Sequence, residues 1–161
     1  MHRVAQFVAH VRARVDPAEE AVVRRLLPPP AAELFASMPV ADRRHGLDVA
    51  ERLMASGQDD RDLLSAALLH DAAKGDRMQL WHRIAGVLLE SFAPSVLGRL
   101  ARPDPASWRH AFHLYLHHEP MSAELAERAG CSARAAGFIR GSVDERDAHL
   151  LRALKAADDA S

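Results

Sequence analysis

The spacing of apolar residues constrains the fold of this chain more than any other feature. Apolar residues recur every three or four positions and the runs end at Pro or Gly, as in Leu63-Leu64, Ala67-Leu68 and then Gly75. This spacing places them on one face of a helix. No segment of the sequence has the sustained alternation of β-branched and polar residues that is typical of a strand. The sequence therefore predicts an all-α fold.

The ends of the helices follow from Pro, Gly and capping residues. Asp16-Pro17, for example, is an N-cap followed by Pro in the first helical position. The predicted helices cover residues 4–15, 17–27, 31–38, 42–56, 59–74, 78–92, 107–118, 132–140 and 144–158, with others opening at Pro94 and Pro120.

Composition and charge exclude several classes of protein. A chain of 161 residues with 48% hydrophobic and 27% charged residues fits one globular domain. The formal charge of -1 gives no basic excess, so nucleic acid is not an expected partner. We find no apolar run of about 18 residues and no signal peptide, and Cys131 stands alone. These features predict a cytoplasmic protein without a membrane partner.

Charged residues end the most apolar helix of the chain. The stretch LLSAALLHDAAKG, residues 63–75, carries His70 and Asp71 at the end of the apolar run and Lys74 one turn later. Burial of an ionised side chain in an apolar wall costs several kcal/mol unless a partner or a metal compensates it. The stretch therefore predicts that other polar groups or a cation meet His70 and Asp71.

Two other polar residues share a face with core positions. His45 lies four and eight residues before Val49 and Leu53, and Asp158 lies four residues after Leu154. Both spacings place the polar side chain on the buried side of its helix. We therefore expect His45 and Asp158 to point towards the core.

Together these residues make a set of two imidazoles and two carboxylates, His45, His70, Asp71 and Asp158. Such a set suits one divalent Mn, Fe, Co, Ni or Zn ion and leaves coordination positions for water and a substrate oxygen. Lys74 projects from the same face and could hold an anionic substrate group.

Ordinary explanations exist for the same residues. Asp71 could simply pair with Lys74 as a buried ion pair, and Asp158 could be solvated. Asp159 falls beside Lys155 on the face that we expect to be exposed. In that case the chain would be a structural helical protein.

Three motifs resemble the HD-domain superfamily of metal-dependent phosphohydrolases, whose pattern is H...HD...D. They are RRHGLDVAERL, ALLHDAAKG and LLRALKAADD, and the resemblance covers about residues 35–160. It implies an all-α HD-type bundle over residues 41–161, with residues 1–40 as N-terminal helices that pack on it in one structural unit or form a homo-oligomer. It also implies His45, His70, Asp71 and Asp158 as metal ligands and Lys74 as a neighbour of the substrate phosphate.

Members with two metals carry further histidines, and here two alignments are open. In the first, HEPMSAELAERAG supplies His118, and Gly141-Ser142 stand where a second imidazole is expected. In the second, HRIAGVLLE supplies His82 and HHE at residues 117–119 supplies His117 and His118, which would restore a dinuclear site. We favour the first, which leaves one metal ion.

The resemblance implies a phosphohydrolase in which a metal-activated water attacks a phosphomonoester or small nucleotide. Asp71 and Lys74 would be catalytic. The alternative is a catalytically degenerate HD-domain scaffold, or a module that senses a nucleotide or a metal, and Gly141-Ser142 is the feature that supports it.

Overall fold

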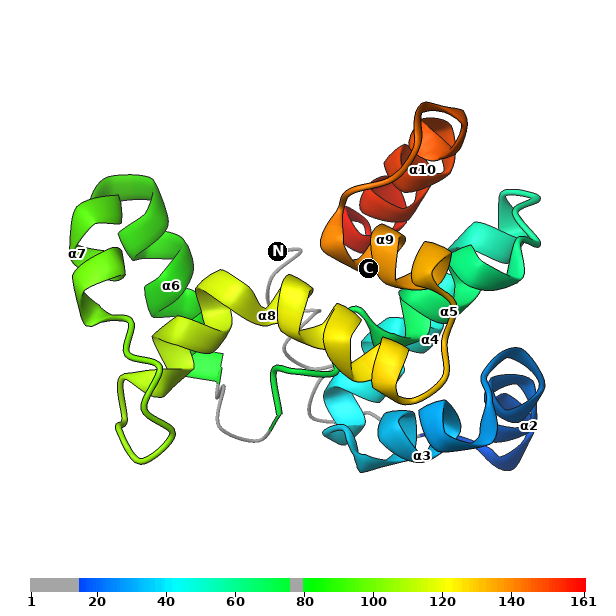
Figure 1. Ribbon diagram of the computed structural model, residues 1–161, viewed down its shortest axis with the longest axis horizontal. Helices are drawn as coiled ribbons and strands as arrows, with labels where there is room; N and C mark the ends of the chain where they lie inside the picture. Colours follow the sequence, from blue (N-terminus) through cyan, green and yellow to red (C-terminus); the bar gives the residue numbers. More distant parts are fainter. Residues whose placement is uncertain (1–14, 76–79) are drawn as a thin grey trace.

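The structure, a computed structural model, describes residues 15–75 and 80–161, and all regular secondary structure in these two ranges is helical. The predicted all-α fold is therefore confirmed. The helix expected over residues 4–15 and the first residues of that expected over 78–92 lie outside the described residues. The α-helices are α2 (Pro17–Leu26), α3 (Pro29–Ser37), α4 (Val40–Ala55), α5 (Arg61–Leu69), α6 (Leu80–Phe92), α7 (Pro94–Leu100), α8 (His110–Arg128), α9 (Ala133–Arg140) and α10 (Ala148–Asp159), with a 3₁₀ turn η1 (Glu145–Asp147) before the last (Figure 1).

Helix α5 forms the centre of the fold. Asp60 caps its N-terminus by accepting a hydrogen bond from the backbone N–H of Leu63, and every residue from Leu63 to Leu69 is buried. It packs against α2, α4, α8, α9 and α10. A helix that is buried all round must be covered on every side, which explains why its apolar run is nearly continuous.

The helix predicted over residues 59–74 ends earlier, at Leu69, and residues 70–75 form successive turns. Ala72 N–H donates to the carbonyl of Leu69, and Lys74 N–H donates to that of Asp71. These bonds to the third preceding residue tighten the chain, as is common at helix ends. His70 and Asp71 therefore leave the helix in a turn, and the prediction that the helix reaches Lys74 is wrong.

Pro120 does not open a new helix, as was predicted, but lies inside α8. It has no N–H to donate to the carbonyl of Leu116, and a proline usually kinks or ends a helix at such a point. Packing on both sides preserves the helix: Phe112 and Leu114 are buried before the proline, and Ala123 and Ala126 after it. The loss of one hydrogen bond is offset by these contacts.

One hydrophobic cluster joins most of the helices. It contains residues from α2, α3, α4, α5, α9, α10 and the C-terminal half of α8. Val23 and Phe35, from the region predicted to pack on the core, belong to this cluster. The described part of the N-terminal region thus contributes to the same core as the rest.

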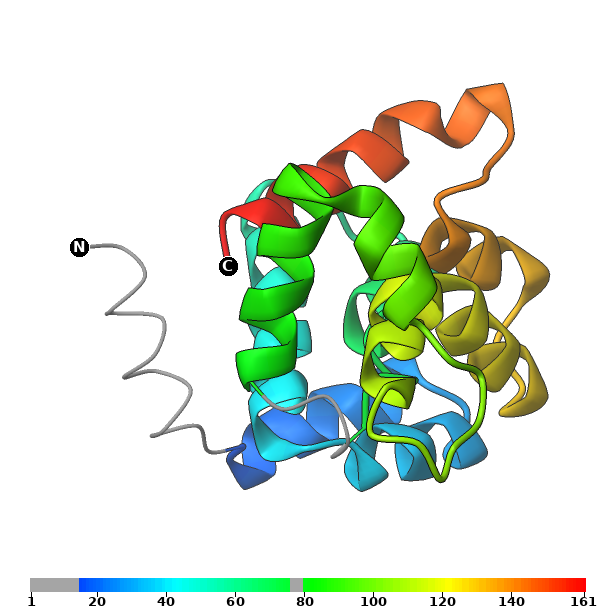
Figure 2. The same ribbon diagram turned by 90° about the vertical axis from the view of Figure 1, so that its left-hand side faces the viewer.

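The segment formed by α6, α7 and the first half of α8 stands apart from this body (Figure 1) and faces the viewer in Figure 2. Leu97, Ala111, Phe112 and Leu114 are buried there but lie outside the main cluster. Among the described residues, none of the helices has the length and apolar character needed to cross a bilayer.

Candidate functional site

The predicted ligand residues come from α4, from the end of α5 and from α10, which meet on one side of the molecule's central helix. Helix α10 packs against both α4 and α5. Gly46, next to His45, allows α4 to approach α5 closely: a Cβ at this position would lie 3.0 Å from the carbonyl oxygen of Leu68. The sequence thus brings His45 near the end of α5 by placing a residue without a side chain at the contact.

His45, His70 and Asp158 form a compact cluster. His45 Nε2 lies 2.8 Å from Asp158 Oδ1, and His70 Nε2 lies 3.4 Å from the same oxygen. One ligand atom from each of the three residues lies within 4.8 Å of the other two. The structure therefore brings together three of the four predicted ligands, from segments up to 113 residues apart.

Asp71, the fourth predicted ligand, borders the cluster and is paired with Lys74. Its Oδ1 lies 3.5 Å from His70 Nε2, and its side chain is only 1% exposed. Lys74 Nζ lies 2.6 Å from Oδ1 and 2.7 Å from Oδ2. Burial alone would raise the pKa of Asp71, but His70 and Lys74 hold it well below its usual range. The carboxylate is therefore ionised at neutral pH.

His70 has one ring nitrogen whose role is fixed by the backbone. Its Nδ1 lies 2.9 Å from the carbonyl oxygen of Ala67, so Nδ1–H must donate to it. Its Nε2 is buried and has no hydrogen-bond partner. Histidines that bind metals are commonly oriented in this way, with one N–H held by a carbonyl and the other nitrogen facing the metal.

Two carboxylates make the surroundings of His70 favourable for a positive charge. Burial would lower the pKa of this histidine, but Asp71 and Asp158 together raise it above its ordinary value. The pKa of Asp158 is held far below its usual range because His45 and His70 outweigh the effect of burial. A proton on His70 or a divalent cation would each satisfy these groups.

His118 lies beside Asp71. Its Nδ1–H donates to the carbonyl of Tyr115, and its Nε2 lies 3.9 Å from Asp71 Oδ1. Burial and the nearby Lys74 lower the pKa of this histidine. His118 is therefore neutral near pH 7 and presents Nε2 towards the cluster.

His82 and His117, which the second alignment uses, lie elsewhere. His82 is buried against Trp81 and Phe112, with ring centroids 3.5 and 5.7 Å away. The ring of His117 lies against that of His113, with centroids 4.5 Å apart and ring planes inclined by 47°. Both lie in or next to the segment of α6, α7 and the first half of α8, and neither lines the pocket at the ligand cluster.

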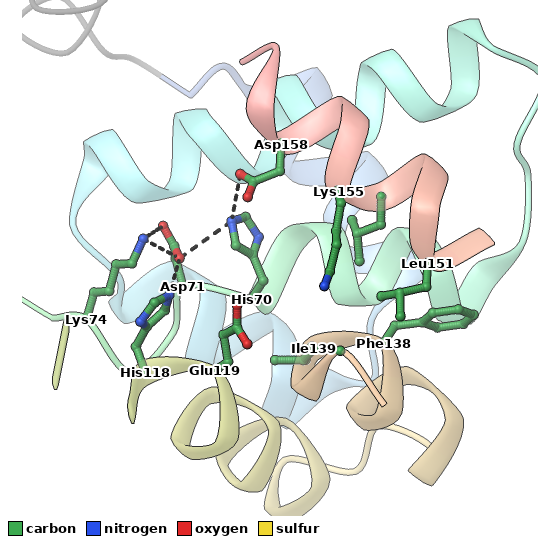
Figure 3. A pocket seen from close by; sticks show the side chains of 12 residues that line it. His70, Asp71, Lys74, His118, Glu119, Phe138, Ile139, Leu151, Lys155 and Asp158 are labelled. Atoms are coloured by element: carbon green, nitrogen blue, oxygen red, sulfur yellow. Dashed lines mark hydrogen bonds and ion pairs between the residues drawn. The ribbon is translucent and has the colours of Figure 1, made fainter. Parts of the chain in front are cut away.

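A pocket of about 80 Å³ opens beside the cluster (Figure 3). Its polar end holds charged and imidazole side chains, and its other end is apolar. The polar lining is His70, Asp71, Lys74, His118, Glu119, Lys155 and Asp158, and the rest is Phe138, Ile139, Gly141, Leu151 and Leu154.

Lys155 is exposed on α10, as the sequence predicted, and it also lines the pocket. It reaches from α10 into the space between His70 and Ile139 (Figure 3). A usable signal was present, because Lys155 precedes Asp158 by three residues, and side chains three apart on a helix share a face. Gly141 lines the pocket next to it.

Ser122 is a second residue that sequence reasoning missed. It is fully buried on α8, and its Oγ accepts a hydrogen bond of 3.0 Å from the backbone N–H of Ala73. This bond ties the turn that carries Asp71 and Lys74 to α8. Nothing in the sequence marks a serine 49 residues away as the anchor of that turn.

The arrangement offers two imidazole nitrogens and carboxylate oxygens for a divalent cation, beside a pocket with two lysines. This donor set fits the transition metals that imidazole prefers. Comparisons with protein-family models, with curated proteins and with solved structures found no match for this chain.

Proposed function

We propose that this chain is a metal-dependent phosphohydrolase that acts on a phosphomonoester or a small nucleotide, as the resemblance to HD-domain proteins implies. The observation that carries the proposal is the convergence of His45 from α4, His70 from the end of α5 and Asp158 from α10, with Nε2 of His70 buried without a hydrogen-bond partner and facing the carboxylates. A buried ring nitrogen without a hydrogen bond costs free energy, and a bound cation would remove that cost.

In this proposal His45, His70 and Asp158 hold one Mn, Fe, Co, Ni or Zn ion, with Asp71 next to it. Bound there, such an ion would lower the pKa of a water molecule and polarise a phosphoryl oxygen. The three ligand atoms are within 4.8 Å of one another, which is close to the span across an ion with bonds of about 2.1 Å.

The protein's own side chains supply orientation. Lys74 keeps Asp71 ionised and in place, through contacts with both of its oxygens. The carbonyl of Tyr115 orients His118 so that its Nε2 accepts a hydrogen bond from the attacking water. The apolar end of the pocket limits the water that reaches the substrate.

The proposal is tested on protein purified without chelators or a His tag. We expect about one equivalent of a divalent transition metal by mass spectrometry, and turnover of p-nitrophenyl phosphate. Asp158→Ala should lose both. Asp159→Ala is the matched control, because it removes a carboxylate one residue further along, at an exposed position outside the cluster.

The outcomes separate the candidate functions. Protein without metal, even after reconstitution with each of the five ions, would contradict the phosphohydrolase. A second candidate, a degenerate scaffold or sensor, is supported by Gly141 at the pocket in place of an imidazole. Bound metal and bound phosphate without turnover would favour that candidate.

A further inference from the structure

The two lysines of the pocket have different surroundings. Lys74 Nζ contacts both oxygens of Asp71, so its charge is already balanced by a buried carboxylate. Lys155 has no such partner: within residues 15–75 and 80–161 no carboxylate pairs with its ammonium group. Lys155 is thus the cation of the pocket that has a charge to offer a ligand.

Gly141 leaves space beside this ammonium group. A Cβ at position 141 would lie 3.6 Å from Lys155 Nζ and 3.9 Å from Cε, so any larger side chain would fill the volume next to the amine. Gly141 also ends α9 in the left-handed conformation, with φ of +71°, which side chains rarely adopt. The residue that departs from the two-metal pattern is therefore the one that keeps the amine accessible.

The charges that line the pocket call for this second cation. Asp71, Asp158 and Glu119 contribute three carboxylates, and Lys74 balances only the first. A phosphate dianion would be repelled by the others unless positive charge were added. A bound metal ion would supply part of that charge, and Lys155, on the opposite side of His70 from Lys74 in Figure 3, would supply the rest.

The size of the pocket limits what can enter. A volume of about 80 Å³ is much smaller than that of typical ligand sites, which is roughly 300–1,000 Å³. It can hold a group the size of a phosphate but no sugar or base. The body of the substrate must therefore remain outside the pocket.

We propose that Lys155, next to the open side of Gly141, is the residue that binds the phosphoryl group of the substrate, and that the pocket accepts the phosphate of a monoester while its alcohol part stays outside. This inference rests on the proposed phosphohydrolase and names the recognition element of that same site. It transfers the phosphate-binding role from Lys74 to Lys155. It also predicts that the enzyme accepts phosphomonoesters of varied alcohols.

The experiment compares Lys155→Met with the wild-type chain. We expect the KM for p-nitrophenyl phosphate to rise about tenfold, as for the loss of one charged hydrogen bond, with a smaller change in kcat. The dissociation constant of inorganic phosphate, measured by calorimetry with and without the metal, should rise by a similar factor. Metal content should be unchanged. Lys155→Arg should restore most of the phosphate affinity.

Arg152→Met is the matched control, because it removes one positive charge from an exposed residue of α10 that does not line the pocket. Phosphate affinity should be unaffected in this variant. Equal loss in both variants would show a general charge effect and overturn the inference.

Other outcomes also decide the matter. Wild-type KM and phosphate affinity in Lys155→Met would overturn the role of Lys155 while leaving the phosphohydrolase in place. A wild-type protein that binds no inorganic phosphate would also overturn the role of Lys155. If the wild-type chain holds no metal, the proposed function fails, and the phosphate titration on the metal-free protein still decides the binding residue.

Discussion

Lys74 and Lys155 show how burial assigns different roles to two residues of one type. The side chain of Lys74 is 17% exposed and touches a carboxylate that is 1% exposed, whereas Lys155 lies at the open side of the pocket. A buried ion pair contributes to folding mainly because removal of one member leaves the other charge unsolvated. We therefore expect the two lysines to differ in what their loss affects.

Lys74→Met should lower the free energy of unfolding by about 3 kcal/mol in the absence of metal, because Asp71 would remain as an uncompensated buried charge. Urea denaturation followed by circular dichroism measures the change. Lys155→Met, which breaks no ion pair, should stay within about 0.5 kcal/mol of wild type. Similar stability of the two variants would contradict the assigned roles.

At this scale the sequence predicted which residues gather but not how they pair. The helical faces of His45 and Asp158 and the end of the apolar run at His70 could be recognised from spacing alone. The sequence left two possible partners for Lys74, the carboxylate of Asp71 or a substrate. Which of the two it contacts depends on the shape of the turn after α5, which spacing does not predict. Lys155 is exposed, as its spacing predicted, but the sequence did not reveal that it also lines the pocket, because a residue at the edge of a helical face can border both sides.

Helix packing at Gly46 determines whether His45 reaches the cluster. The carbonyl oxygens of Leu68 and Ala67 lie 3.0 and 3.1 Å from where a Cβ would stand, and both belong to the backbone of α5, which cannot move aside cheaply. Such close approach of two helix backbones requires the smallest residue. The position of α4 on α5 therefore depends on this glycine.

Gly46→Ala should push α4 away from α5 and lower the free energy of unfolding by about 1–3 kcal/mol, as overpacking does. It should also weaken metal binding, because His45 moves with α4. Gly98→Ala in α7 is the matched control: nothing lies within 4 Å of its added Cβ, so higher helix propensity should stabilise that variant by up to about 1 kcal/mol. Denaturation curves of both variants check the opposite signs.

The sequence predicted the order of the described helices better than their ends. The capping residue Asp16 placed a helix start correctly, since a side chain that accepts a backbone N–H acts locally. The end of α5 and the continuity of α8 through Pro120 depend on tertiary packing. No local signal reports such contacts.

At the scale of the whole molecule, one arginine links segments from distant parts of the chain. Arg134 on α9 donates to Asp60 at the start of α5 and to Asp147 in η1. The hydrogen bonds from Arg134 lower the pKa of Asp147 against the effect of burial. The link therefore ties α10, through the turn before it, to the central helix.

The pKa of Asp147 is lower in the folded chain than its value of 3.8 in the unfolded chain. The ionised Asp147 therefore stabilises the fold fully at pH values above 3.8, and this stabilisation is lost as the pH falls through the folded pKa. Asp147→Asn should therefore melt below wild type at pH 6, and the gap should close towards pH 2. Thermal melts across this range measure it. Asp144→Asn, which removes an exposed pair with Arg146, should show no such gap; a gap that stays constant with pH would contradict the assignment.

The contact between His45 and Asp158 also has a consequence for synthesis of the protein. Its two members are 113 residues apart, so a ribosome must deliver α10 before the cluster can close. A nascent chain that has folded only as far as α9 can bury much of α5 but lacks the carboxylate of Asp158. In the proposed phosphohydrolase, capture of the metal ion can therefore only follow the synthesis of α10.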